Sequence, residues 1–62
     1  MYEGEYALIV DSLCSMGYER TASAAAVSKI SAELTADASF AAKPRIERED
    51  SVFKKALMEL AQ

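Results

Sequence analysis

Apolar residues recur at spacings of three and four along the first part of the chain, which is the periodicity of an amphipathic helix. These apolar residues form one stripe along the helix, with Val10 and Cys14 beside it, and the pattern predicts a helix over about residues 5–16. Gly17 then stands where a left-handed C-cap is favoured, and Tyr18 takes the position that packs back on the last turn. The stripe itself consists of Tyr6, Ile9, Leu13 and Met16.

The glycine corner leads into a second helical pattern, which we expect over about residues 19–34. Its larger apolar side chains, Val27, Ile30 and Leu34, are again three and four apart, among many alanines. Alanine is the best helix former, and its small side chain lets a neighbouring helix approach closely. A third stripe predicts a helix over about residues 48–61; it consists of Phe53, Leu57 and Leu60, with Val52 and Ala56 beside it.

The connection over about residues 35–47 predicts a loop, because the pair Lys43-Pro44 disfavours helical geometry before the proline. We expect Phe40 or Ile46 to pack from this loop onto the core. No alternation typical of a strand occurs in the sequence. The pattern therefore predicts an all-α fold, a compact bundle of three helices.

The start of the last helix allows two interpretations of one acidic residue. Asp50 is either the N-cap or an acid of the first turn. If it lies inside the helix, it can pair with Lys54 one turn later.

Length and composition limit the domain organisation and the class of protein. A chain of 62 residues forms a single small domain, and with one cysteine and no histidine it has neither an internal disulfide nor a Cys/His zinc site. A net charge of −3 disfavours a free-standing nucleic-acid-binding domain. Because no membrane span or signal peptide is visible and Cys14 stands alone, we expect a cytoplasmic location. Residues 1–4 are interpreted as a linker remnant or tail, and residues 5–62 as the domain.

Candidate catalytic groups lack the partners that they need. Ser12, Cys14 and Ser15 could act as nucleophiles only beside an activating base, and histidine is absent. The acidic residues are scattered near helix ends, and the two glycines stand alone rather than in a phosphate-binding loop. We therefore expect no catalytic, cofactor-binding or metal-binding residues.

Apolar residues near the Gly17 corner exceed what three small stripes can bury, so some of them should be exposed. Exposed apolar patches on small domains are often partner sites, and methionine suits an adaptable contact. Ordinary core packing explains the same residues, and the pattern leaves both interpretations open. The residues concerned are Leu8, Leu13, Met16, Tyr18, Val52, Leu57 and Met58.

These motifs resemble the C-terminal domain, domain III, of the bacterial Holliday junction branch-migration protein RuvA. In that family a helix ends in leucine-x-x-leucine followed by Gly-Tyr or Gly-Phe, the next helix often has a Val-Ser-Lys-Ile-like stretch, and the last ends in an Arg/Lys-Glu/Lys-Ala-Leu motif. The matching segments here are Leu-Cys-Ser-Met-Gly-Tyr at 13–18, Val-Ser-Lys-Ile at 27–30 and Phe-Lys-Lys-Ala-Leu at 53–57. The resemblance covers roughly residues 6–34 and 48–61.

The resemblance implies a bundle of the ubiquitin-associated type and a non-catalytic, regulatory part of an ATP-dependent branch-migration helicase complex in DNA recombination and repair. The domain would dock on the RuvB motor ATPase and regulate branch migration. The expected partner-binding residues are Leu13, Met16, Tyr18 and Leu57, with Gly17 as the structural corner. The fragment would be a monomer that does not bind DNA itself, whereas the parent protein would be a tetramer on four-way junctions.

Two other interpretations of the sequence predict different partners. The corner Met16-Gly17-Tyr18 is also similar to the Met-Gly-Phe/Tyr loop of ubiquitin-associated domains, which implies an adaptor that binds another protein through this corner and the last helix. A DNA-binding helix-turn-helix module would need a basic recognition helix. The second helix carries only Arg20 and Lys29 as basic residues, which disfavours that reading.

Overall fold

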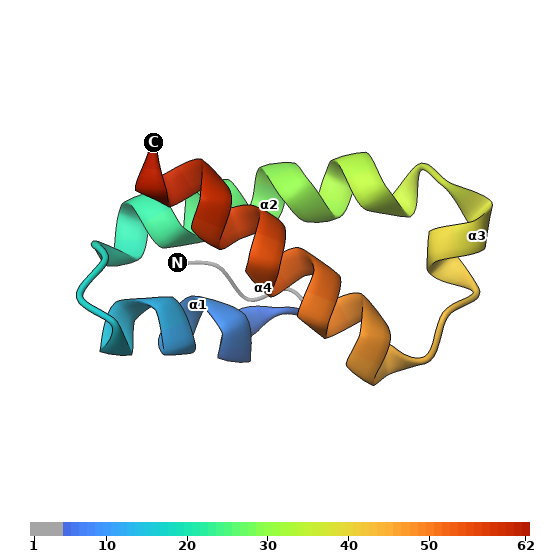
Figure 1. Ribbon diagram of the computed structural model, residues 1–62, viewed down its shortest axis with the longest axis horizontal. Coiled ribbons are helices and arrows are strands. Elements are labelled where there is room, and N and C mark those ends of the chain that lie inside the picture. The colour runs from blue at the N-terminus through green and yellow to red at the C-terminus, as the bar shows by residue number, and fades with distance from the viewer. Residues whose placement is uncertain (1–4) are drawn as a thin grey trace.

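The computed structural model describes residues 5–62, and within this range the chain is helical and contains no strand (Figure 1). The prediction of an all-α fold is thus confirmed for the described residues, although four helices are present rather than three. The interpretation of residues 1–4 as a linker remnant or tail lies outside this range. The helices are α1 (Ala7–Ser15), α2 (Arg20–Thr35), α3 (Ala38–Ala41) and α4 (Arg45–Ala61).

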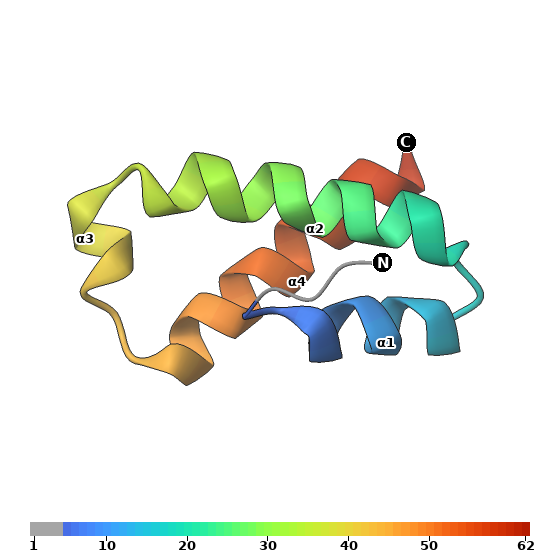
Figure 2. The same cartoon turned by 180° about the vertical axis from the view of Figure 1, so that it is seen from behind.

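Helix α2 is the central element, and both α1 and α4 pack against it (Figures 1 and 2). Leu13, Val27 and Val52, one from each of these helices, are fully buried where the three apolar stripes meet. The alanines of α2 allow this close approach because their side chains add little bulk. The core consists of Tyr6, Ile9, Val10, Leu13, Ala26, Val27, Ile30, Phe40, Val52 and Ala56.

The prediction of a loop over residues 35–47 is wrong in part, because this segment contains α3 and the first turn of α4. The Asp37 side chain accepts a hydrogen bond from the Ser39 backbone N–H at 2.9 Å and so caps α3. Phe40 is buried and anchors this short helix on the core, whereas Ile46 is exposed. A single aromatic anchor and one cap therefore order a segment that lacks a helical stripe of its own.

Helix α4 begins at Arg45, three residues before the expected start. Pro44 is its N-cap, with φ −58° and ψ 153°. The fixed φ of proline suits the start of a helix, although proline disfavours helical geometry in the residue before it. Asp50 consequently lies inside the helix and pairs with Lys54 at 3.0 Å. Both the N-cap and the first-turn interpretations of Asp50 are wrong, because Asp50 is the sixth residue of α4, whereas the pairing with Lys54 that is expected inside the helix is confirmed.

Candidate protein-interaction surface

The corner between α1 and α2 has the geometry that the sequence predicts for a glycine C-cap. Gly17 has φ +103°, and among the described residues no residue other than glycine has a positive φ. The Gly17 N–H donates to the Cys14 carbonyl at 3.0 Å, and the Tyr18 N–H donates to the Leu13 carbonyl at 3.2 Å. These two bonds form a Schellman motif, which closes the end of α1 and fixes the direction in which the chain leaves it.

The predicted partner-binding residues do not form one exposed set. Leu13 has no exposed surface, because it lies at the centre of the stripe and packs among the core residues of all three longer helices. Its assignment as a docking residue is therefore corrected to a core role. Met16 is 53% exposed, whereas Tyr18 and Leu57 are half-buried against the core. These three can contribute surface to a contact.

One ion pair shows which flank of α4 faces α2. The Lys29 ammonium donates to the Glu59 carboxylate at 3.0 Å, and this carboxylate raises the pKa of Lys29. With 3.6 residues per turn, three apolar residues lie about 100–160° around α4 from Glu59 and form the opposite flank. These are Phe53, Leu57 and Leu60, all half-buried against the core.

A second ion pair joins α1 to α2. Asp11 pairs with Arg20 in the first turn of α2 at 3.0 Å, and both side chains are more than half exposed. Asp11 lies about 160° around α1 from the buried Ile9 and Leu13, so this pair is on the side of α1 opposite its buried stripe. Met16 continues the direction of that stripe, but it is the C-cap of α1 and is 53% exposed.

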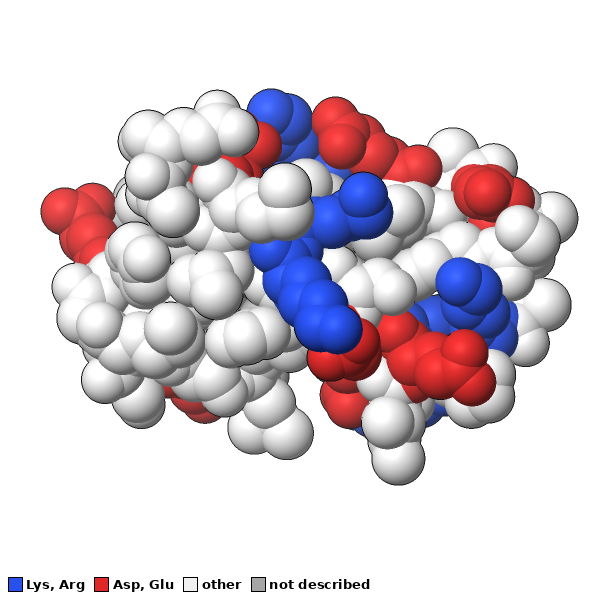
Figure 3. All heavy atoms as spheres, in the orientation of Figure 1, with Lys and Arg blue, Asp and Glu red and all other residues white. Residues whose placement is uncertain are grey.

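Both ribbon views place the α1–α2 corner and the C-terminal end of α4 at the same end of the molecule (Figures 1 and 2). Figure 3 shows a broad uncharged area at this end, with Lys, Arg, Asp and Glu side chains gathered over the other half of the same face. We use the name corner surface for the exposed or half-buried apolar residues of the corner and of the apolar flank of α4, namely Met16, Tyr18, Phe53, Leu57 and Leu60. Its composition suits contact with an apolar partner.

The stripe of α4 explains why sequence reasoning missed part of this surface. The pattern predicts that the stripe of Phe53, Leu57 and Leu60 faces the core, with Leu57 also expected to bind the partner, yet Val52 and Ala56 are the residues of α4 with no exposed surface. Both sets have helical spacing, so periodicity alone cannot rank them. The small side chain of Ala56 lets α4 approach α2 closely, and this turns Phe53 toward the edge of the core.

The described residues outside the corner surface offer few groups for chemistry. The hydroxyl groups of Tyr6 and Ser23 are buried and make no hydrogen bond within the part of the chain that the structure describes. Burial raises the pKa of Tyr6, Glu5 adds to the rise, and Arg48 opposes it. Cys14 is a free, half-buried thiol. Across residues 5–62 there is neither a pocket nor a group of three acidic or Cys side chains that could hold a metal ion.

No helix within residues 5–62 combines the length and the apolar character needed to cross a bilayer. Comparisons of the chain with protein-family models, with curated proteins and with solved structures found no match.

Proposed function

We propose that this chain is a protein-interaction domain that docks on a motor ATPase of the RuvB type and regulates branch migration in DNA recombination and repair. The observation that carries the proposal is the corner surface: Met16 is 53% exposed at the α1–α2 corner, which lies at the same end of the molecule as the C-terminal end of α4 (Figures 1 and 2). The choice of partner comes from the resemblance of residues 13–18, 27–30 and 53–57 to the RuvA C-terminal domain.

In this proposal α1, α2 and α4 correspond to the three helices of a bundle of the ubiquitin-associated type. Helix α3 is then an addition within the connection between the second and third of them. Such an addition lies between residues 36 and 44, which places it between two segments of the resemblance rather than inside one. The motif-bearing helices keep their order and their short glycine corner.

The residues of the corner surface have separate tasks in the proposed contact. Met16 is the adaptable anchor, since an unbranched thioether side chain fits irregular apolar partners. Tyr18 and Leu57 supply partly exposed apolar area beside it. Leu13 supports the corner from beneath and does not touch the partner. The contact would hold the motor against a junction complex while an upstream tether absorbs its movement.

The charge distribution supports a protein partner over DNA. Arg20, Lys29, Arg45, Arg48 and Lys54 each pair with a carboxylate of this chain. Cations that are already paired release fewer counterions from DNA, so they add less to phosphate binding. We therefore expect no salt-sensitive binding of this domain to a four-way junction.

A ubiquitin-associated adaptor is the second candidate. The feature that favours it is the Met16-Gly17-Tyr18 corner closed by the Schellman bonds, because that family binds through a corner of the same composition. This candidate uses the same surface with a different partner. Only a binding comparison separates the two.

The test is calorimetric titration of the intact 62-residue chain with a RuvB-type motor ATPase, with free ubiquitin and with a four-way DNA junction. The proposal expects saturable binding to the ATPase and none to the other two ligands. Binding to ubiquitin alone would replace the proposal with the adaptor. Binding to the junction that weakens as salt rises would replace it with a DNA-binding function.

A further inference from the structure

Arg48 differs from the other paired cations of the described chain. Its side chain is 22% exposed, whereas those of Arg20, Lys29, Arg45 and Lys54 are 53% exposed or more. Exposed pairs contribute little because water and salt screen them. A half-buried guanidinium with partners in two directions is a stronger constraint on the chain.

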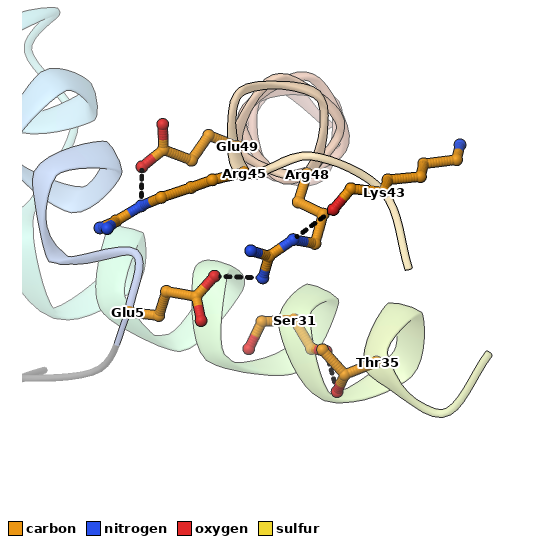
Figure 4. Close-up of polar contacts among 7 residues, drawn as sticks. All are labelled: Glu5, Ser31, Thr35, Lys43, Arg45, Arg48 and Glu49. Atoms are coloured by element: carbon orange, nitrogen blue, oxygen red, sulfur yellow. Dashed lines mark hydrogen bonds and ion pairs between the residues drawn. The ribbon is translucent and has the colours of Figure 1, made fainter. Parts of the chain in front are cut away.

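The contacts of Arg48 join three separate parts of the chain. Its Nε donates to the Lys43 carbonyl at 3.1 Å, and one terminal nitrogen donates to the Glu5 carboxylate just before α1. Figure 4 shows the guanidinium lying between these two partners, on the side of α2 that carries Ser31. Arg48 thus ties α4 both to the entry of α1 and to the connection that precedes α4.

That connection is a strap, residues 36–44, which spans the end of the molecule between α2 and α4 (Figures 1 and 2). Its attachments within the described residues are few. Phe40 is buried on the core, Asp37 caps α3, and the Lys43 carbonyl is held by Arg48. Segments with few buried contacts are those that open locally without global unfolding.

We propose that Arg48 is a latch that couples the order of the strap to the position of Glu5. When Glu5 holds the guanidinium, the guanidinium is fixed where it reaches the Lys43 carbonyl, and the strap stays closed with Phe40 buried on the core. When Glu5 is displaced or loses its charge, the guanidinium gains freedom and the strap opens more often. The latch thus connects Glu5 with Lys43, which is 38 residues later in the sequence.

The latch is independent of the proposed docking contact, because no residue of the corner surface takes part in it. Its role is to couple the conformation of the strap to the position of Glu5. A force or a binding event that moves the chain at Glu5 would be transmitted to the strap at the opposite side of Arg48. The coupling acts through one side chain and can be broken without altering the core.

Hydrogen–deuterium exchange tests the latch on three variants of the full chain. In Glu5→Gln and in Arg48→Lys we expect amides of the strap to exchange about tenfold faster, since the loss of a charge-assisted hydrogen bond shifts a local opening equilibrium by that order. Arg45→Lys is the matched control, because Arg45 lies in the same first turn and pairs with Glu49 inside α4. It should leave strap exchange unchanged.

Amides in the centre of α2, around Val27, report global stability in the same experiment. Faster exchange of the strap with unchanged exchange around Val27 supports the latch. Unchanged strap exchange in Glu5→Gln overturns it, as does an equal acceleration of the strap in the Arg45→Lys control. Acceleration of the strap and of α2 by the same factor also overturns it, since the effect would then be on the whole fold.

Discussion

The two ends of the molecule reverse the chain by different means. At the corner, α1 passes to α2 through Gly17, and the bonds that fix the turn join residues no more than five apart. At the strap, α2 passes to α4 through residues 36–44, and the latch that holds it reaches Glu5, 43 residues from Arg48. The corner is therefore a local structure that forms with its own helix. The strap depends on contacts that exist only once the whole domain has folded.

This difference assigns the two ends different roles. A rigid corner presents Met16 and Tyr18 in fixed positions, which lowers the conformational entropy that binding would otherwise cost. A strap whose order depends on the Arg48 latch can change its conformation when the chain at Glu5 moves.

Leu13→Ala should have the largest effect on folding, because Leu13 has no exposed surface. Removing a buried leucine leaves a cavity and costs about 2–5 kcal/mol, which is most of the stability of a small domain. Thermal denaturation followed by circular dichroism measures the loss. Met16→Ala, at the exposed C-cap of the same helix, is the control and should melt near the wild-type temperature. Equal melting temperatures for Leu13→Ala and wild type would contradict the core assignment.

Phe40→Ala should cost less than an equivalent change at the centre of the core. The truncation of a buried aromatic commonly costs about 3–5 kcal/mol, but a peripheral strap can open without unfolding the rest, so we expect about 2 kcal/mol. Urea denaturation measures the free energy of unfolding. Ile46→Ala, at an exposed position, is the matched control, and its free energy of unfolding should lie within about 0.5 kcal/mol of wild type. A loss as large as that of Leu13→Ala would show that the strap is part of the central core.

Gly17→Ala should cost about 1 kcal/mol, because a side chain at φ +103° strains the backbone. A Cβ at this position would meet no heavy atom within 4 Å, so the cost arises from the backbone alone. A synthetic chain with D-alanine at position 17 separates backbone strain from the effect of adding a methyl group, since a D-residue favours positive φ. The D-alanine chain should melt above the L-alanine chain. The reverse order would disprove the left-handed cap.

The smallest effect concerns the pH dependence of the strap. The Ser39 backbone N–H, together with its hydroxyl group, holds the pKa of Asp37 below its ordinary value of 3.8. A lowered pKa in the folded state stabilises the fold above the unfolded pKa, and this contribution is lost as the pH falls through the folded value. Thermal melts between pH 2 and 6 should therefore show Asp37→Asn approaching wild type as the pH falls. A constant difference at every pH would exclude the carboxylate as the cause.

The sequence allowed much of the corner end to be predicted. The stripe of Tyr6, Ile9 and Leu13 located α1, and Gly17 followed by Tyr18 located its C-cap, because both signals lie within a few residues of the structure that they specify. The stripe of Val27 and Ile30 located α2 for the same reason. Short-range patterns are sufficient where short-range contacts determine the structure.

The strap end could not be predicted in the same way. Nothing within residues 36–44 indicates that Phe40 is buried while the nearby Ile46 is exposed, since that choice depends on where α4 crosses α2. The register of α4 failed for a related reason. The pattern favoured Phe53 as the core residue over Val52, and only the close packing of α4 on α2 decides between them.

Two methionine substitutions, compared by calorimetric titration with a RuvB-type motor ATPase, test whether the proposed docking uses the corner surface. Met16 belongs to the corner surface, whereas Met58 is similarly exposed, at 65% against 53%, but lies on the outward side of α4. Truncation of an interface anchor costs about 2 kcal/mol, roughly a thirtyfold loss of affinity. If the partner docks on the corner surface, Met16→Ala should show this thirtyfold loss and Met58→Ala should keep full affinity. The circular dichroism spectra of both variants should be unchanged. Full affinity in Met16→Ala, or an equal loss in both variants, would contradict docking on the corner surface.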